Sequence, residues 1–128
     1  MPLVRISMMK RPSGVARAIG GTVYRTMRET LNVPVDDNFQ VIHEHDTDTL
    51  VFDKHYLGIE RSDAIVVVQI TLNEGRTLEM KKAFYAALAR NLHDDHGLRV
   101  EDVFVSLVEV KKENWSFGRG LAQYAPAD

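Results

Sequence analysis

The sequence contains no cysteine, which excludes disulfide bonds, thiolate metal ligands and cysteine nucleophiles. It also lacks a long hydrophobic run, because the longest, Ala64 to Val68, is far too short to span a bilayer. The first residues alternate in character and include Arg5, which is not the pattern of a secretory signal. We therefore expect a cytoplasmic protein with no membrane partner.

Neither sign of charge is in clear excess. The chain has 16 lysines and arginines against 18 aspartates and glutamates, a formal net charge of −2. This balance argues against nucleic acid as the main partner. With 128 residues, 45% of them hydrophobic, the chain can build one compact core, and we expect a single domain over residues 1–128.

The first half of the chain has the pattern of a β-α-β unit. Leu3 to Met9 is strand-like, and Ser13 is a candidate N-cap for the following helix. Asn32 is expected to end that helix in the left-handed conformation, and Phe39 to Ile42 predicts a second strand. One face of the helix carries apolar residues at every fourth position, namely Val15, Ile19, Val23 and Met27.

The second half repeats this order. The β-branched run Ala64 to Leu72 is typical of a strand buried on both faces. A turn at Asn73-Glu74-Gly75 leads to Arg76 and to Thr77, a capping residue. The apolar face of the predicted helix is Met80, Phe84, Leu88 and Leu92. In the connector between the halves, Leu50-Val51-Phe52 predicts a short extra strand.

A constant shift of 65 residues relates the two halves. Arg76 corresponds to Arg11, since 76 − 11 = 65, and the four apolar helix positions obey the same shift. Three later pairs also match: Asn32 with Gly97, Asp37 with Asp102, and Phe39 with Phe104. The sequence thus predicts a duplicated β-α-β domain with halves at about 2–63 and 64–128.

This duplication defines an architecture of the α/β (α+β) class. Each half needs a right-handed crossover between parallel strands, and joining the halves gives a four-stranded mixed sheet with two helices on one face. The other face of so apolar a sheet would not remain in water. We therefore expect subunits to associate through their sheets.

The motifs resemble those of the tautomerase superfamily, whose subunits are duplicated β-α-β units. The resemblance rests on Pro2 directly after Met1, on Gly75-Arg76-Thr77 and on the repeat, and it covers nearly the whole chain. Further motifs resemble the malonate semialdehyde decarboxylase branch: Val33-Pro34, Asp37, Phe39-Gln40, Leu57-Gly58, Arg61-Ser62 and Trp115-Ser116-Phe117-Gly118.

The resemblance implies a role for five residues. With Met1 removed, Pro2 would be a secondary amine whose pKa is lowered by desolvation and a nearby guanidinium, so that it can act as a general base. Arg76 would bind a substrate carboxylate and stabilise an enolate. Asp37 would activate water or orient Pro2 and the substrate, and Trp115 and Phe117 would line the pocket. The family also implies a homotrimer that needs no cofactor.

Three functions remain open at this stage. The first is a tautomerase that ketonises enols of small 2-oxo acids. The second is a malonate semialdehyde decarboxylase-like or hydratase-like lyase with a protonated Pro2. The third is a noncatalytic trimeric binding protein. Glu74 stands where the decarboxylase prototype has the first of two arginines, which weakens the case for malonate semialdehyde as substrate. His43 and His45 share a strand face, but without a third ligand they predict no metal site.

Overall fold

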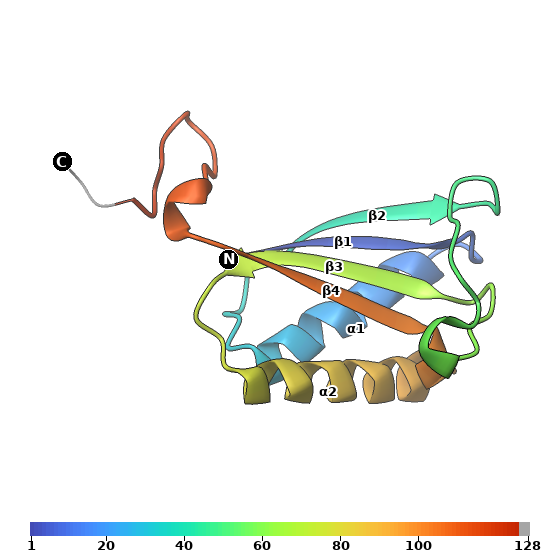
Figure 1. Ribbon diagram of the computed structural model, residues 1–128. Helices are drawn as coiled ribbons and strands as arrows, with labels where there is room; N and C mark the ends of the chain where they lie inside the picture. The colour runs from blue at the N-terminus through green and yellow to red at the C-terminus, as the bar shows by residue number, and fades with distance from the viewer. Residues whose placement is uncertain (126–128) are drawn as a thin grey trace.

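The computed structural model describes residues 1–125 and contains two layers, a four-stranded sheet and two helices packed on one of its faces (Figure 1). The main elements are β1 (Pro2–Met9), α1 (Val15–Thr30), β2 (Phe39–His45), β3 (Val66–Asn73), α2 (Leu78–His96) and β4 (Val103–Val110). The predicted fold class is confirmed. A shift of 65 moves residues 2–9 to 67–74, against 66–73 observed, so the sequence repeat is also a structural repeat.

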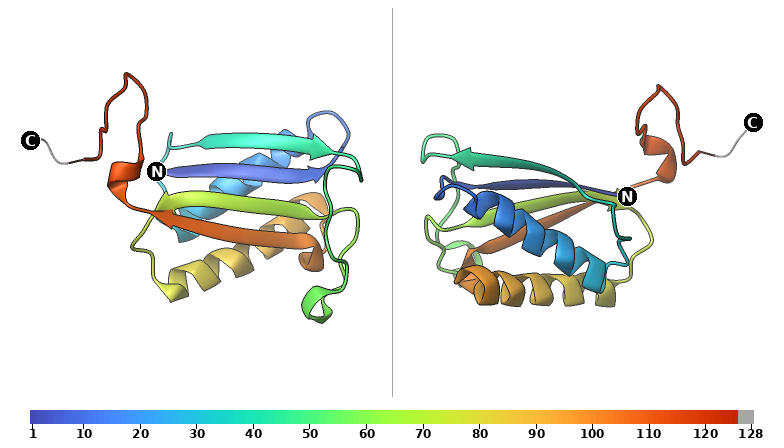
Figure 2. Two further views of the ribbon diagram at one scale, coloured as in Figure 1. Left: turned by 45° about the horizontal axis from the view of Figure 1, so that its top comes forward. Right: turned by 180° about the vertical axis from the view of Figure 1, so that it is seen from behind.

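The sheet has the strand order β2-β1-β3-β4. Within each half the two strands are parallel, and the halves meet where β1 runs antiparallel to β3. In that central pairing Pro2 lies opposite Leu72 and Met8 lies opposite Val66. The amino end of β1 therefore lies beside the carboxyl end of β3, at the end of the sheet from which the C-terminal tail also projects (Figures 1 and 2).

The core lies between the sheet and the helices. Alternate residues of the central strands point towards the helices and are fully buried: Val4, Ile6, Met8, Val66, Val68, Ile70 and Leu72. Against them pack the predicted helix faces, with Ile19, Val23, Met27, Phe84, Leu88 and Leu92 buried. Val15 and Met80 lie at the edge of this cluster and are partly buried. Alternation in the strands and the helical period therefore give one shared core.

Three of the four predicted helix boundaries are correct. Thr77 caps α2, its Oγ1 accepting a hydrogen bond from the Met80 N–H at 3.2 Å. Asn32 and Gly97 follow the two helices with left-handed φ angles of 56° and 68°. The prediction for Ser13 is wrong, because Gly14 is the N-cap of α1 with φ 85° and no side chain caps the helix. Glycine adopts this conformation at no steric cost, so the chain turns into the helix one residue later.

Two strand predictions also need correction. The segment Leu50-Val51-Phe52 forms no strand; it has no strand partner and instead borders a cavity against the starts of β3 and β4. The strand predicted at Phe39 to Ile42 continues to His45, because β1 pairs with it as far as Met9. Pairing with the long central strand β1 therefore sets the length of β2.

The second face of the sheet carries no helix in residues 1–125 (Figure 2). Four large apolar side chains are exposed on this face of the two edge strands: Phe39 and Val41 of β2, and Phe104 and Val108 of β4. Exposure of such large apolar side chains to water is unfavourable. Neither α1 nor α2 is long and apolar enough to cross a membrane.

The core makes a stability prediction at Phe84. This side chain is fully buried, whereas the next residue on α2, Tyr85, is 39% exposed. Phe84→Ala should lower the free energy of unfolding by about 3–5 kcal/mol, because it removes apolar contacts and leaves a cavity. Tyr85→Ala should cost about 1 kcal/mol or less. Chemical denaturation of the two variants measures the difference, and equal losses would contradict this account of the core.

Candidate active site at the amino end of the sheet

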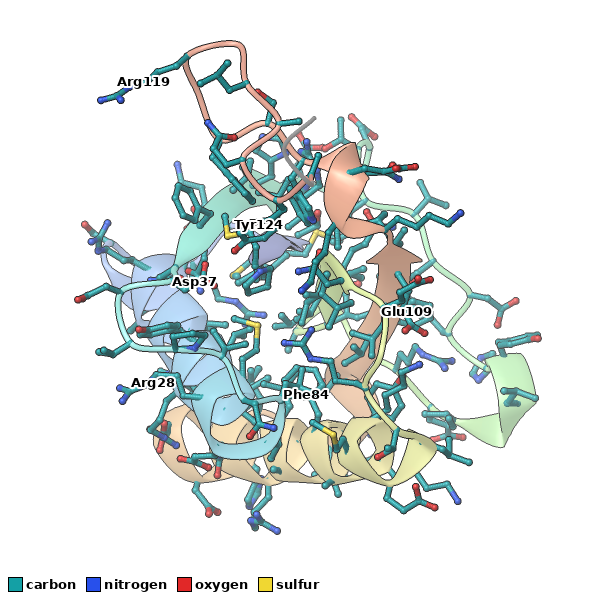
Figure 3. The ribbon with its side chains drawn as sticks, turned by 90° about the vertical axis from the view of Figure 1, so that its left-hand side faces the viewer. Arg28, Asp37, Phe84, Glu109, Arg119 and Tyr124 are labelled. Atoms are coloured by element: carbon teal, nitrogen blue, oxygen red, sulfur yellow. The ribbon has the colours of Figure 1, made fainter. Side chains whose placement is uncertain are left out.

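The amino terminus lies next to the carboxylate of Asp37. Pro2 is buried at the start of β1, and the Met1 amino nitrogen is 3.6 Å from Asp37 Oδ2. Figure 3 looks onto this end of the sheet, with Asp37 on the loop between α1 and β2 and Tyr124 in the tail. The fold thus brings an amine at the start of β1 and an acid from the α1–β2 loop into one ion pair.

A tight loop holds Asp37 in place. Asp36 has a left-handed φ of 68°, and its backbone N–H donates to the Tyr24 hydroxyl at 2.9 Å. The Asp37 N–H donates to the Pro34 carbonyl at 3.4 Å. Asp37 Oδ1 is buried and has no hydrogen-bond partner within residues 1–125. A buried carboxylate oxygen in this state can accept a hydrogen bond from a substrate or a water molecule.

Asp102, the counterpart of Asp37 in the second half, has a different environment. It is fully buried, and the backbone N–H and the hydroxyl of Ser62 each donate to its carboxylate at 2.6 Å. Arg99 adds an ion pair at 3.8 Å. The acid at this repeat position is therefore enclosed by protein groups in the second half, as Asp102. In the first half, as Asp37, it keeps an oxygen unpaired within the described residues, beside the amino terminus.

Arg76 binds the carboxyl end of α1. Its Nε and Nη2 donate to the Leu31 carbonyl at 3.1 and 3.0 Å, and its Nη1 donates to the Asn73 carbonyl at 3.2 Å. Leu31 is the C-cap of α1, where the helix dipole favours a positive charge. This contact explains a cation just before α2. Three of the five guanidinium N–H groups are used, so two remain for a carboxylate.

The tail provides an aromatic wall beside the amino terminus. Trp115 and Phe117 stack with ring centroids 5.7 Å apart and an interplanar angle of 17°. They border a cavity of about 230 Å³ whose other lining residues are Met1, Leu3, Phe39 and Ser116. Asp37 and Arg76 do not line this cavity; Asp37 lies in the α1–β2 loop and Arg76 in the β3–α2 loop. Five predicted residues thus lie at one end of the sheet.

A larger cavity, of about 440 Å³, lies at the opposite end of the sheet. The connector segment 50–56 and Arg61 border it, together with Ile65, Val67 and Phe104. It does not include the amino terminus, Asp37 or Arg76. Among the described residues, the amine, Asp37, Arg76 and the aromatic wall all lie at the end of the sheet where β1 begins, and we place the candidate active site there.

Sequence reasoning missed two groups of this site. The first is the Leu31 carbonyl, which a side-chain motif cannot reveal because it belongs to the backbone. The second is Asn73, expected in a turn but found as the last residue of β3, where its Oδ1 accepts a hydrogen bond from Trp115 Nε1 at 2.7 Å. Its signal was a polar residue directly after an apolar strand and three residues before Arg76.

Other polar groups do not add to the site. The His43 and His45 rings lie edge to face with centroids 6.0 Å apart, and within residues 1–125 no group of three or more histidines and acids could hold a metal ion. Glu74 is exposed, and its backbone N–H donates to the Val110 carbonyl at 2.9 Å. The Glu74 side chain therefore lies at the surface, and it precedes Arg76 by two residues in the sequence.

Comparisons with known proteins identify the family of this chain. A family model described as "Tautomerase enzyme" matches residues 37–118. Probable tautomerase YusQ of Bacillus subtilis (strain 168) is 40% identical over 96% of this chain and 98% of its own length. Probable tautomerase YrdN of the same organism is 32% identical over 97% of this chain and 96% of its own length.

Solved structures give the same picture. A malonate semialdehyde decarboxylase, FG41, inhibited by 3-bromopropiolate, is 34% identical with a TM-score of 0.88, covering 95% of this chain and 93% of that chain. A second malonate semialdehyde decarboxylase is 30% identical with a TM-score of 0.87, covering 95% of both chains. A fused 4-OT symmetric trimer, 20% identical with a TM-score of 0.75, has the same fold over 95% of this chain and 97% of its own. The resemblance inferred from the motifs is confirmed, and the chain belongs to the tautomerase family of enzymes.

Proposed function

We propose that this tautomerase ketonises the enols of small 2-oxo acids with the nitrogen of Pro2 as its general base. The observation that carries the proposal is the meeting of the amino terminus with the Asp37 carboxylate, 3.6 Å from the terminal nitrogen, beside an aromatic cavity. Arg76 follows the strand end that pairs with Pro2, and it retains two N–H groups for a substrate carboxylate.

The proposed reaction moves one proton and needs no cofactor. Neutral Pro2 nitrogen removes the enol hydroxyl proton, and the electron pair forms the carbonyl as the adjacent carbon takes the proton back from the prolinium. The substrate and product are isomers, so atoms and electrons balance. Arg76 holds the carboxylate and stabilises the negative charge that develops on the neighbouring oxygen. The apolar wall of Trp115 and Phe117 excludes water and strengthens that charge interaction.

This mechanism requires the removal of Met1. While Met1 is attached, the Pro2 nitrogen is part of an amide and cannot accept a proton. Met1 also lines the cavity that the substrate would enter. Its removal would free the secondary amine and enlarge the cavity in one step. A chain that retains Met1 would instead suit the third alternative, a noncatalytic binding protein.

One observation favours a second candidate, a decarboxylase-like or hydratase-like lyase. The Asp37 carboxylate forms an ion pair with the Met1 amino group, and after removal of Met1 it would lie beside the Pro2 amine; this mechanism would use a protonated Pro2 to polarise a carbonyl while Asp37 assists water. Two solved malonate semialdehyde decarboxylases are similar to this chain over most of its length. Against this candidate, Glu74 stands where the resemblance calls for a second substrate-binding arginine.

We also propose that the working form is a homotrimer. The sheet face that exposes Phe39, Val41, Phe104 and Val108 at its edge strands is covered by neither α1 nor α2. Fused 4-OT proteins of the same fold form trimers. Three sheets packed around a common axis would bury this face and close the assembly.

The role of Arg76 predicts a specific loss of rate. Arg76→Ala should reduce kcat/KM on a carboxylate-bearing enol by an amount equal to about 2–4 kcal/mol of transition-state stabilisation. Arg11→Ala is the matched control, since this repeat counterpart lies at the other end of the sheet and donates to the Ala64 carbonyl at 2.7 Å. Steady-state kinetics with parallel denaturation curves separates catalysis from stability. If neither variant changes kcat/KM, the site is assigned wrongly.

The protonation state of Pro2 distinguishes the two mechanisms. After intact mass has established a chain that begins at Pro2, enol ketonisation should rise with pH through the titration of the amine, because only the neutral form accepts a proton. Asp37→Asn should retain most of this activity and move the rise to lower pH, because a negative charge that stabilises the ammonium is gone.

The opposite pattern would establish the lyase. Wild type would then ignore enols and decarboxylate malonate semialdehyde, with a rate that falls as pH rises and is abolished by Asp37→Asn. A fully active chain that still carries Met1 would exclude both mechanisms, because its Pro2 nitrogen is an amide.

The trimer predicts a mass of three chains by light scattering. Phe104→Lys would place a charge on the uncovered sheet face and should shift the protein towards monomers, whereas Tyr85→Lys, on α2, should leave its mass unchanged. A wild-type monomer or dimer that persists across a wide concentration range would contradict the trimer.

A further inference from the structure

Asn73 lies between two parts of the candidate site, the Arg76 guanidinium and the aromatic wall of Trp115 and Phe117. It is the last residue of β3, and the strand alternation places its side chain on the face away from the helices, with Thr71 and Val67. Residues at the end of a strand on an uncovered face are usually solvated, yet Asn73 is only 9% exposed. The tail covers it, so its polar groups need partners within the protein.

Two hydrogen bonds connect Asn73 to these two parts, one to the Trp115 indole and one to the Arg76 guanidinium. Its side-chain Oδ1 accepts from Trp115 Nε1 at 2.7 Å, and its backbone carbonyl accepts from Arg76 Nη1 at 3.2 Å. The indole N–H is a donor only, so its partner must be an acceptor of suitable length. An asparagine provides that acceptor without adding a negative charge next to the guanidinium.

The bond to Asn73 is the one hydrogen bond that joins the tail, residues 111–125, to the remainder of the described chain. The other hydrogen bonds of the tail are internal; Gln123, for example, accepts from the Phe117 N–H at 2.9 Å and donates to the Gly118 carbonyl at 2.7 Å. Phe117 stacks on Trp115 and meets Tyr124 edge to face with centroids 4.7 Å apart. The aromatic wall is thus one unit with a single polar attachment point.

We propose that Asn73 is a positioning residue that fixes the aromatic wall, through Trp115, at a set place relative to Arg76 and the amino terminus. This inference rests on the proposed function for the roles of Arg76 and the wall. Loss of the Asn73 acceptor would leave the Trp115 N–H unpaired and let the whole tail unit move away from the cavity. Substrate binding would weaken, while the proton transfer itself, carried by Pro2, would continue once substrate is bound.

The single tryptophan of the chain is a direct probe of this attachment, because all tryptophan fluorescence comes from Trp115. Asn73→Leu should shift the emission to the red and increase acrylamide quenching. Asn73→Asp keeps an acceptor and should preserve the wild-type emission. Thr71→Val, on the same face two residues earlier, is the control and should change neither property. Unchanged emission and quenching in Asn73→Leu would overturn the attachment.

Kinetics on an enol substrate then tests the positioning role. Asn73→Leu should raise KM roughly tenfold with kcat changed less than about threefold, the size expected for one lost hydrogen bond. Trp115→Phe removes the donor but keeps a ring, and adding Asn73→Leu to it should give no further rise in KM. Additive effects of the two substitutions would show that Asn73 does not act through Trp115.

The Asn73→Asp variant tests the role of Asn73 through the pH profile of ketonisation, which a purely structural role would not change. Asn73→Asp places a carboxylate near Arg76 and the amino terminus, so the pH at which ketonisation rises should increase while the emission stays at its wild-type position. If Asn73→Leu fails to fold, this variant still decides, because an unchanged pH profile would contradict the placement of Asn73 in the site. If wild type shows no activity on enols, the proposed function fails, and the fluorescence of the variants alone decides the attachment.

Discussion

The antiparallel register of β1 with β3 is the constraint on which the site depends. Pairing Pro2 with Leu72 places the amino terminus next to Asn73, and from there the chain reaches Arg76 in three residues. A slip of one residue would turn the buried side chains of one of the two strands to the wrong face, so the core itself enforces this register. The packing of residues such as Ile6 and Ile70 against the helices therefore also fixes which end of β3 lies beside the start of β1.

Duplication supplies two similar ends, and the groups at these two ends have different environments. At the end where β1 begins, Asp37 Oδ2 is 3.6 Å from the Met1 amino nitrogen, and Asp37 Oδ1 is buried and unpaired within the described residues. At the other end the chain continues through the connector, and Ser62 satisfies both oxygens of Asp102. Arg11 is likewise enclosed there, and burial lowers its pKa although Asp102 and Glu44 oppose the shift. A closed end of this kind contributes stability, whereas the open end retains unsatisfied groups that chemistry can use.

Local sequence patterns predicted most of the fold because each pattern occurs in both halves of the duplicated chain. Helix faces, the Thr77 cap and the left-handed residues Asn32 and Gly97 follow from short-range sterics and periodicity, which sequence displays directly. The errors arose where tertiary context decides: Leu50-Val51-Phe52 has strand-like residues but no strand to pair with, and Gly14 rather than Ser13 makes the turn into α1. In the site, motifs pointed to side chains such as Asp37 and Trp115. They could not show that Arg76 binds the Leu31 carbonyl, since a backbone acceptor at a helix end has no residue type of its own.

The hydrogen bonds that Arg76 makes within the fold affect how it could act in the candidate site. Its guanidinium is held by two carbonyls from different elements, so it is fixed in position before any substrate arrives, and little side-chain entropy remains to be lost on binding. The same carbonyls carry partial negative charge, which offsets part of the field of Arg76 at the amino terminus. In the proposed mechanism the protonation of a free Pro2 amine would depend on three groups together: the Asp37 carboxylate, the Arg76 guanidinium and the carboxyl end of α1. A substrate carboxylate bound to Arg76 would add a further negative charge close to that amine, so the proposal predicts different protonation of Pro2 in the complex and in the free enzyme.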